Sequence, residues 1–231
     1  MGMEWYNIIA LRNGGYKDNA TYIVEGVSGE DVFKERLIKM LGNCESVLDS
    51  GCGHGEFTIK MGKYANNIIG FDNSKELIKI AVETLKESKI ENVSFVYAWT
   101  KDNKPLPFED QQFDLIYSRR GPTSIAYHSR VLRSGGTIYG ICPEYPNIIN
   151  IVSERLSHNG FVNIEINVFD SAILVFPNVK EFAKFLTAFP GNPDYTLPES
   201  KRILDEKVKE NMINGRLCYK QWRFIWKAIK A

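Results

Sequence analysis

Residues 47–57, VLDSGCGHGEF, constrain the fold more than any other stretch of the sequence. Two apolar residues lead into Asp49, glycines follow at positions 51, 53 and 55, and a helix-like run begins at Glu56. Because each glycine raises the entropic cost of ordering the backbone, three in alternation indicate that something needs this main chain free of side chains. A strand, a loop and a helix in this order place the loop at the carboxyl edge of a parallel sheet, where open α/β folds bind ligands.

The segments around this loop alternate between helical and strand patterns. Ser28, with Asp31 three residues later, resembles a capping box and predicts a helix over residues 28–42, and Ser74 is expected to cap another helix. Further helices are expected at about residues 56–65 and 125–132, and strands at residues 46–50, 67–72, 93–98, 113–118 and 137–141. This alternation predicts βαβ units and an α/β fold whose parallel sheet is covered on both faces.

The pattern changes after residue 142. Alternating apolar residues predict a strand over residues 162–168, and a second strand is predicted from Trp222 to Ala228. Residues 178–191 and 198–213 are helix-like and are expected to cap the site. The inner face of the first is expected to consist of Val179, Phe182, Ala183, Phe185 and Leu186. Trp222, Phe224 and Trp226 alone would suit a nucleic-acid stacking platform, but their strand spacing favours the core.

Composition limits the class of protein. A chain of 231 residues suits one domain, and a formal net charge of +1 gives no general attraction to nucleic acid or anionic membrane. The four cysteines are scattered, so neither a metal site nor a disulfide framework is expected. Glu4 and Trp5 stand where a signal peptide would be basic and apolar, and no apolar run is long enough to span a membrane. We therefore expect a cytoplasmic protein.

The glycine spacing and Asp49 restrict the ligand. A dinucleotide fingerprint is G-x-G-x-x-G, whereas Gly55 follows Gly53 by only two residues. A carboxylate at the loop entrance repels a phosphate and attracts an ammonium group. The expected ligand therefore carries a positively charged end.

The segment VLDSGCGHGEFT resembles motif I of the class I S-adenosylmethionine-dependent methyltransferases, an acid followed by G-x-G-x-G. IIGFDNS is similar to the family's second acidic strand end, LPFEDQQFDLIYS to its fourth strand, and VLRSGGTIYGI to its helix, glycine turn and fifth strand. The resemblance implies a Rossmann-like fold with a seven-stranded, mostly parallel sheet, helices on both faces and an antiparallel last strand. It further implies one domain over residues 1–231, with a cofactor-binding core at 28–141 and C-terminal strands with a helical cap at 142–231.

The resemblance also implies S-adenosylmethionine as cofactor. Asp49 would lie near its amino acid end, and Asp72 would accept from both ribose hydroxyls. The full set of cofactor-binding residues implied is Asp49, Ser50, Gly51, Cys52, Gly53, Gly55, Asp72, Asn73, Trp99, Thr100 and Ser118. Where relatives place an acid for the adenine amine, this chain has Trp99, so either Asp102 takes that role or Trp99 packs on the adenine with backbone groups reading its edge.

The catalytic residues are not identified by spacing. Arg119 and Arg120 follow the fourth strand, where they would suit an anionic group on the acceptor or pair with surface acids. His128 is a candidate base, although a histidine on a helix surface is more common. The sequence SRRGP replaces the N-P-P-Y type of relatives that methylate base amines, which argues against such an acceptor.

Three further side chains have a structural and a functional interpretation. His54, between two loop glycines, is expected to shape the loop or the cofactor's edge. Glu144 is expected to be a solvated turn residue, and the thiol of Cys52 to pack under the loop. The N-terminal residues 13–26, NGGYKDNATYIVEG, either cover the cofactor or lie on the surface, and both interpretations stay open.

The expected function is methyl transfer to a small or medium-sized acceptor. One alternative is an RNA methyltransferase, since the arginines at positions 119, 120, 130 and 133 would form a basic cluster if they lay together. The sequence is also compatible with a non-catalytic binder of this cofactor or of a nucleotide, and with a nicotinamide-dependent oxidoreductase on a similar sheet.

Overall fold

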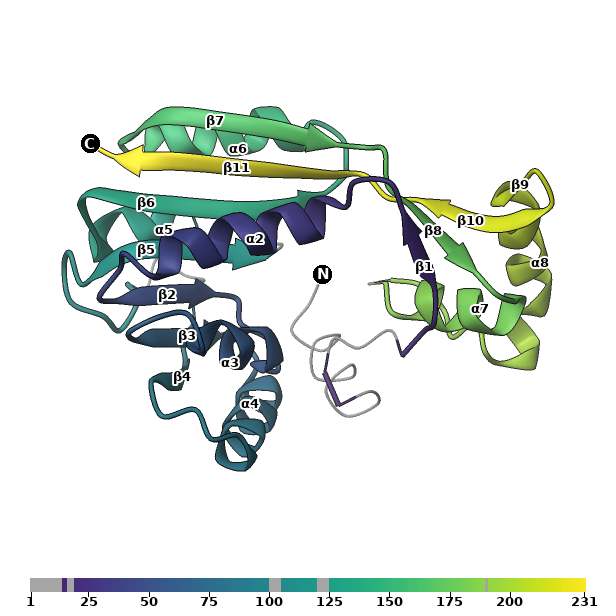
Figure 1. Ribbon diagram of the computed structural model, residues 1–231, viewed down its shortest axis with the longest axis horizontal. Coiled ribbons are helices and arrows are strands. Elements are labelled where there is room, and N and C mark those ends of the chain that lie inside the picture. The colour runs from purple at the N-terminus through teal and green to yellow at the C-terminus, as the bar shows by residue number, and fades with distance from the viewer. Residues whose placement is uncertain (1–13, 16–18, 100–104, 120–124, 190) are drawn as a thin grey trace.

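The computed structural model describes residues 14–15, 19–99, 105–119, 125–189 and 191–231 (Figure 1). Within them, seven strands form a sheet in the order β4-β3-β2-β5-β6-β11-β7. Their bounds are β2 Val47–Ser50, β3 Ile68–Asp72, β4 Val93–Tyr97, β5 Phe113–Arg119, β6 Leu132–Pro143, β7 Phe161–Phe169 and β11 Arg223–Lys230. The pairs from β4 to β6 are parallel, and β11 runs antiparallel to both β6 and β7. The expected seven-stranded, mostly parallel sheet with an antiparallel last strand is confirmed.

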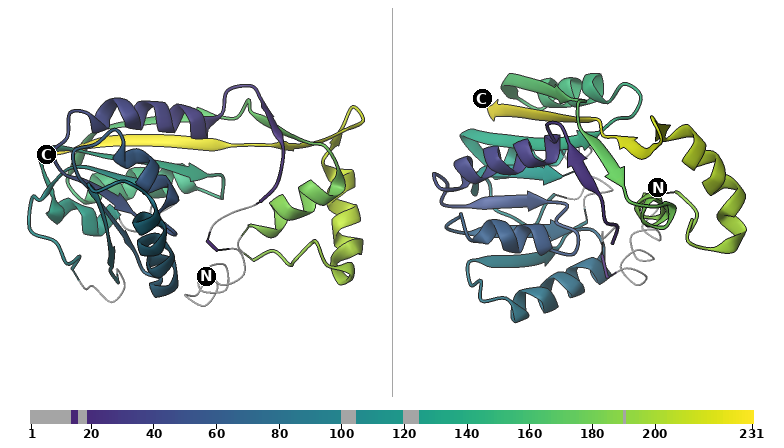
Figure 2. Two further views of the ribbon diagram at one scale, coloured as in Figure 1. Left: turned by 60° about the horizontal axis from the view of Figure 1, so that its bottom comes forward. Right: turned by 45° about the vertical axis from the view of Figure 1, so that its right-hand side comes forward.

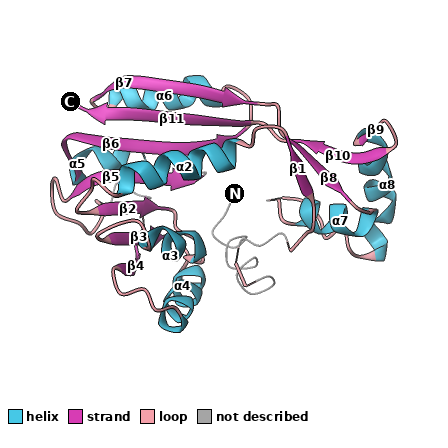
Figure 3. Ribbon diagram, in the orientation of Figure 1, coloured by secondary structure: helices cyan, strands magenta, loops and turns pink. Residues whose placement is uncertain are grey.

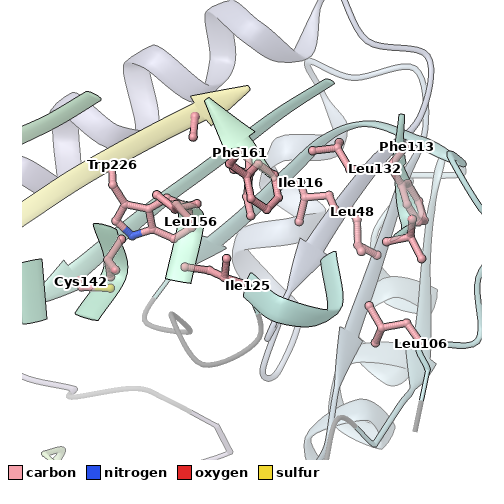
Figure 4. Close-up of a cluster of buried hydrophobic side chains, with 14 of the residues drawn as sticks. Leu48, Leu106, Phe113, Ile116, Ile125, Leu132, Cys142, Leu156, Phe161 and Trp226 are labelled. Carbon is pink, nitrogen blue, oxygen red and sulfur yellow. The ribbon is translucent and has the colours of Figure 1, made fainter. Parts of the chain in front are cut away.

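Helices cover both faces of this sheet (Figure 1). They are α2 Gly29–Leu41, α3 Glu56–Gly62, α4 Lys75–Glu87, α5 Ile125–Val131 and α6 Ile148–His158. Side chains of α5 and α6 pack with those of β5 and β11 in one buried cluster, where Ile125, Leu156 and Trp226 are labelled in Figure 4. A second cluster joins α2 and α3 to the other face, where the rings of Phe33 and Tyr139 stack 4.6 Å apart.

Two predicted helix caps have different outcomes. The hydroxyl oxygen of Ser74 accepts a hydrogen bond from the Leu77 amide at 3.3 Å, which confirms the cap of α4. Ser28 stands at the N-terminal cap position of α2, but its side chain makes no capping bond there. Instead its hydroxyl donates to the side-chain oxygen of Gln221 at 3.2 Å. The predicted capping box is therefore wrong, because a residue distant in sequence competes for the serine.

The last strand depends on a close contact between β6 and β11. Gly140 lies opposite Trp226, and a Cβ at this glycine would overlap the indole ring. Trp226 is 1% exposed and Phe224 is fully buried, while Trp222 is partly buried against the same cluster. The prediction that these aromatic residues belong to the core is confirmed.

A second, four-stranded antiparallel sheet was not expected from the sequence. Its order is β1-β8-β10-β9, with bounds β1 Ile23–Glu25, β8 Ile173–Phe176, β9 Met212–Ile213 and β10 Arg216–Lys220. The helices α7 Val179–Thr187 and α8 Lys201–Glu210, with the short 3-10 helix η2 Pro198–Ser200, accompany it (Figure 3). Phe182, Ala183, Phe185 and Leu186 of α7 are buried as predicted, but Val179 is exposed. The expected cap is thus a sheet with helices, and the division of the chain into domains stays a prediction.

The second sheet lies beyond the carboxyl ends of the parallel strands, in the views of both Figure 1 and Figure 2. β1, residues 23–25, joins that sheet by pairing with β8. Segments that precede and that follow the parallel strands in the sequence therefore both contribute to the second sheet. The loops that follow β2 and β3 therefore point toward this part of the molecule. None of the helices within the described residues has the length and apolar character that crossing a bilayer requires.

Candidate functional site

The glycine loop between β2 and α3 turns sharply at the carboxyl end of β2. Gly51, Gly53 and Gly55 have φ angles of 80°, 59° and 77°. The amides of Gly51 and Cys52 both donate to the Phe71 carbonyl at 2.9 Å, which ties the loop to β3. At Gly55 a Cβ would lie 2.6 Å from the Phe95 ring, so this position excludes a side chain by its conformation and by space.

Asp49 is buried directly below the loop. It is 3% exposed, and one carboxylate oxygen, Oδ2, accepts from the Thr58 hydroxyl at 2.6 Å and from the Tyr117 hydroxyl at 2.9 Å. Burial raises the pKa of Asp49 to about 6, against the two hydroxyl donors and the charge of Arg119, which lower it. The site therefore holds a carboxylate that is costly to ionise and that a cationic partner would stabilise.

Asp72 ends β3 beside the same loop. Its two carboxylate oxygens accept from backbone amides, one from Gly53 at 3.0 Å and the other from Ser74 at 2.9 Å. Burial raises the pKa of Asp72, and these amide donors oppose the shift. Asp49 and Asp72, the two acids identified from the sequence, thus flank one loop. Asp72 also connects that loop to the start of α4.

His128 lies on the other side of β2. Its Nε2 atom is 2.8 Å from the hydroxyl oxygen of Ser50, and the side chain is fully buried. Burial lowers the pKa of His128 to about 3. The expectation of a histidine on a helix surface is wrong, and the role of His128 as a catalytic base stays a prediction. Ser118, in the neighbouring strand β5, is buried with no partner for its hydroxyl among the described residues.

The remaining predicted cofactor residues lie near the ends of β3 and β4. Asn73 follows Asp72 and is half-buried, and Trp99 is half-buried just after β4. Burial raises the pKa of the Cys52 thiol, whose sulfur lies 3.8 Å from the Gly53 carbonyl oxygen, while the residue as a whole is half-buried. Thr100 and Asp102 lie outside the described residues.

The arginines have acidic partners. Arg119 forms an ion pair with Glu30 at 3.3 Å and lies over the Phe57 ring at 4.2 Å. Glu30 also pairs with Arg223 at 2.8 Å. Arg120 lies outside the described residues. Arg119 is therefore partly neutralised where it stands.

His54 connects the glycine loop to the N-terminal segment. Its ring lies 3.3 Å from Glu56, and Gly15 is packed so closely that a Cβ there would overlap the His54 ring. Part of the N-terminal segment therefore contacts the glycine loop, while residues 16–18 are outside the described part. Glu144 directly follows β6 and is exposed, as expected.

Sequence reasoning missed Thr58 and Tyr117. Tyr117 is paired with Asp49 across β2 and β5, so their side chains lie on the same face of the sheet. Aligning the two predicted strands in register would have revealed this pair. Thr58 lies in the first turn of α3, and its contact depends on how that helix packs, which the sequence pattern does not specify.

Sequence comparison gives a family and several relatives. A family model described as "Methyltransferase domain" matches residues 42–160. The chain is 28% identical over 130 residues to a demethylmenaquinone methyltransferase of Lactococcus lactis, which covers 51% of this chain and 50% of the relative. It is 36% identical over 107 residues to an uncharacterized methyltransferase, YcgJ, of Bacillus subtilis, over 45% of this chain and 38% of the relative. The chain thus spans half or less of the length of these curated relatives.

Structural comparison gives the same fold. The crystal structure of YcgJ from Bacillus subtilis matches with a TM-score of 0.64 at 18% identity, over 87% of this chain and 98% of that one. A functionally unknown protein from Deinococcus radiodurans matches with a TM-score of 0.68 at 21% identity, over 99% of this chain and 100% of that one. At these identities the likeness supports the fold alone.

Proposed function

The chain belongs to the class I S-adenosylmethionine-dependent methyltransferase family, and we propose that it transfers a methyl group from this cofactor to a small or medium-sized acceptor. The observation that carries the proposal is the arrangement of Asp49 and Asp72 on either side of a loop of glycines with positive φ angles. Both carboxylates lie at the carboxyl ends of adjacent parallel strands, where folds of this kind bind ligands.

The residues present fit the cofactor chemically. S-adenosylmethionine has an ammonium group at its amino acid end, and Asp49 offers a buried carboxylate to such a cation. The two oxygens of Asp72 accept from the Gly53 and Ser74 amides, and because each carboxylate oxygen has two lone pairs, the carboxylate can also accept from a ribose hydroxyl. An anionic phosphate, in contrast, would meet two carboxylates at this loop.

We assign the cofactor contacts along the strand ends. Asp49 holds the ammonium, with Ser50 and the loop residues Gly51, Cys52, Gly53 and Gly55 forming the backbone cradle. Asp72 and Asn73 hold the ribose, and Trp99 covers the adenine, with Thr100 beyond the described residues. Ser118, at the end of β5, faces the reacting centre.

The residues of this chain need to do little covalent chemistry. Bound S-adenosylmethionine supplies an electrophilic methyl group on a positively charged sulfur. The protein contributes by fixing the position of that group, by excluding water and by holding an acceptor in line with it. We propose that the acceptor enters from the side of the second sheet, which lies beyond the strand ends (Figure 2).

The paired arginines favour a small acceptor over RNA. Arg119 pairs with Glu30, Arg130 with Asp110, and Arg133 with Asp114. A surface that attracts phosphates needs unneutralised cations, and these three arginines each have an acidic partner. Arg119 shares the single carboxylate of Glu30 with Arg223, so a positive charge remains at this point and an anionic group on the acceptor stays part of the proposal. We keep a cytoplasmic location as part of the proposal, since all four cysteines are free thiols.

Thermal unfolding with two ligands tests the proposal. S-adenosylhomocysteine, the expected product, should raise the melting temperature, because a ligand at 100 times its Kd stabilises by about 2.7 kcal/mol. The nicotinamide dinucleotide NAD should leave it unchanged. Stabilisation by NAD alone would support an oxidoreductase instead. Transfer of tritiated methyl groups to fractionated metabolites and, separately, to total RNA would then separate a catalyst from a binder and identify the class of acceptor.

A further inference from the structure

One carboxylate oxygen of Asp49 receives two hydroxyl hydrogen bonds from different elements. Thr58 belongs to α3 and Tyr117 to β5, and both hydroxyls donate to Oδ2, at 2.6 Å and 2.9 Å. Thr58 and Tyr117 are themselves fully buried. Two elements, α3 and β5, therefore donate to a single oxygen atom of a residue in a third element, β2.

The other oxygen of Asp49 is left for a ligand. Within the described part of the chain, Oδ1 accepts no hydrogen bond, whereas Oδ2 is occupied twice. A carboxylate fixed through one oxygen has a defined orientation for the second. The Asp49 side chain therefore has its orientation before the ligand binds and does not change rotamer on binding.

The burial of Asp49 and the charges around it make the two hydroxyl donors important for its ionisation. Asp49 is 3% exposed, and burial of an ionised carboxylate is costly unless donors satisfy it. The charged groups that influence it are Arg119, which favours its ionised form, and Asp72, which opposes it. The two hydroxyls are the direct hydrogen-bond donors that keep a negative charge available at this point.

We propose that Tyr117 and Thr58 are positioning residues that fix and ionise Asp49 for the ammonium group of the cofactor. The inference rests on the proposed function, because it requires the amino acid end of the cofactor to lie at Asp49. Neither hydroxyl touches the reacting atoms. Removing one leaves the carboxylate with a single donor, so that it is less firmly oriented and more readily protonated.

The test compares two ligands that differ only at the amino acid end. S-adenosylhomocysteine carries the ammonium, whereas methylthioadenosine has the same nucleoside and thioether without it. Isothermal titration would give the Kd of both ligands for the unaltered protein, Tyr117→Phe and Thr58→Val. We expect each variant to lose about tenfold in affinity for S-adenosylhomocysteine, the size of one hydrogen bond to a charged group, and to keep its affinity for methylthioadenosine.

Tyr139→Phe is the matched control. Tyr139 is the buried neighbour of Tyr117 in the next strand, β6, but its hydroxyl lies 3.4 Å from the Phe33 carbonyl oxygen on α2 and makes no hydrogen bond to Asp49 among the described residues. This variant should bind both ligands normally. Circular dichroism and melting temperature, measured for every variant, identify any loss of folding.

Each result has a definite meaning. An equal loss of affinity for both ligands in Tyr117→Phe would mean that Tyr117 has only a structural role, and it would overturn the inference. The same selective loss of affinity for S-adenosylhomocysteine in Tyr139→Phe would also overturn it. Unchanged affinity for S-adenosylhomocysteine in both site variants would do the same. If the unaltered protein bound neither ligand, the proposed function itself would fail, which is a distinct outcome.

Discussion

The Nε2 atom of His128 lies 2.8 Å from the hydroxyl oxygen of Ser50, and this contact connects α5 to the last residue of β2. The imidazole is fully buried, and burial lowers its pKa to about 3, so it is neutral at pH 7. Its other nitrogen, Nδ1, has no hydrogen-bond partner among the described residues. Because Ser50 directly precedes Gly51, the pair anchors the glycine loop on the face opposite Asp49.

A buried neutral histidine makes stability depend on pH in a known direction. The unfolded chain binds a proton at His128 near pH 6.5, whereas the native protein does so only near pH 3. The stabilisation is therefore present above pH 6.5 and is lost as the pH falls toward 3. Because of His128, the unfolding free energy of the unaltered protein should fall by about 1.4 kcal/mol between about pH 7.5 and about pH 5.5. We predict that His128→Gln, whose side chain does not titrate, abolishes this fall.

Urea unfolding at both pH values, with and without the substitution, measures this difference. The comparison cancels the opposite contributions of Asp49 and Asp72, whose raised pKa values favour the native state at low pH. An identical pH dependence in the two proteins would show that His128 is accessible to protons in the native state.

The parts of the site that sequence predicts well are those fixed by neighbouring residues. Asp49 and Asp72 stand at the ends of apolar strands, and their positions follow from the strand pattern and the glycine loop alone. His128, in contrast, was expected at the surface, because seven residues of α5 do not reveal which side faces β2. α6 was not anticipated, although Ile148, Val152 and Leu156 repeat at helical spacing and are buried.

The second sheet was missed for a different physical reason. β1 has three residues and pairs with β8, placing Ile23 opposite Val175. Strands this short carry no clear alternation of their own, and their pairing joins segments from the two ends of the chain. The stabilising interactions are therefore long-range contacts that a local pattern does not contain.

Cofactor affinity should depend on the ionisation of Asp49. In the absence of ligand, burial raises its pKa from 3.8 to about 6, so stability from this group is present below pH 3.8 and lost as the pH rises through 6. An ammonium group binds the ionised form, and this binding offsets the stability that is lost when Asp49 ionises. We predict that the affinity for S-adenosylhomocysteine increases as the pH rises through about 6 and then levels off.

The variant Asp49→Asn isolates this effect. It should bind S-adenosylhomocysteine at least about tenfold more weakly at neutral pH, since an amide lacks the charge that attracts the ammonium. Its remaining pH dependence would reflect Asp72, whose pKa is also raised by burial. Titration calorimetry from acidic to mildly alkaline pH gives both curves, and parallel curves would mean that Asp49 does not face the ammonium.

Gly55 should tolerate no side chain. Its φ of 77° is unfavourable for other residues, and a Cβ would lie 2.6 Å from the Phe95 ring and 2.7 Å from Ala81. We predict that Gly55→Ala lowers the unfolding free energy by about 3 kcal/mol, from backbone strain and overpacking together. Gly42→Ala is the control, because Gly42 has a φ of −64° and no described atom within 4 Å of a new Cβ. Urea denaturation of the two variants would contradict the prediction if both were equally stable.

The contact between Gly15 and His54 predicts that the N-terminal segment and the glycine loop are energetically coupled. Gly15 is buried, and a Cβ there would overlap the His54 ring, whereas a Cβ at Gly14 meets no described atom within 4 Å. Both glycines have positive φ, 65° at Gly14 and 119° at Gly15, so Gly14→Ala is a control for an alanine at positive φ in this segment without the overlap. We expect Gly15→Ala to be the more destabilising, and removal of the ring in a Gly15→Ala, His54→Ala double variant to recover about 1 kcal/mol. Melting temperatures and urea unfolding of the single and double variants give this coupling. Strict additivity would place Gly15 away from the His54 ring, whereas recovery would confirm that the two positions are in contact.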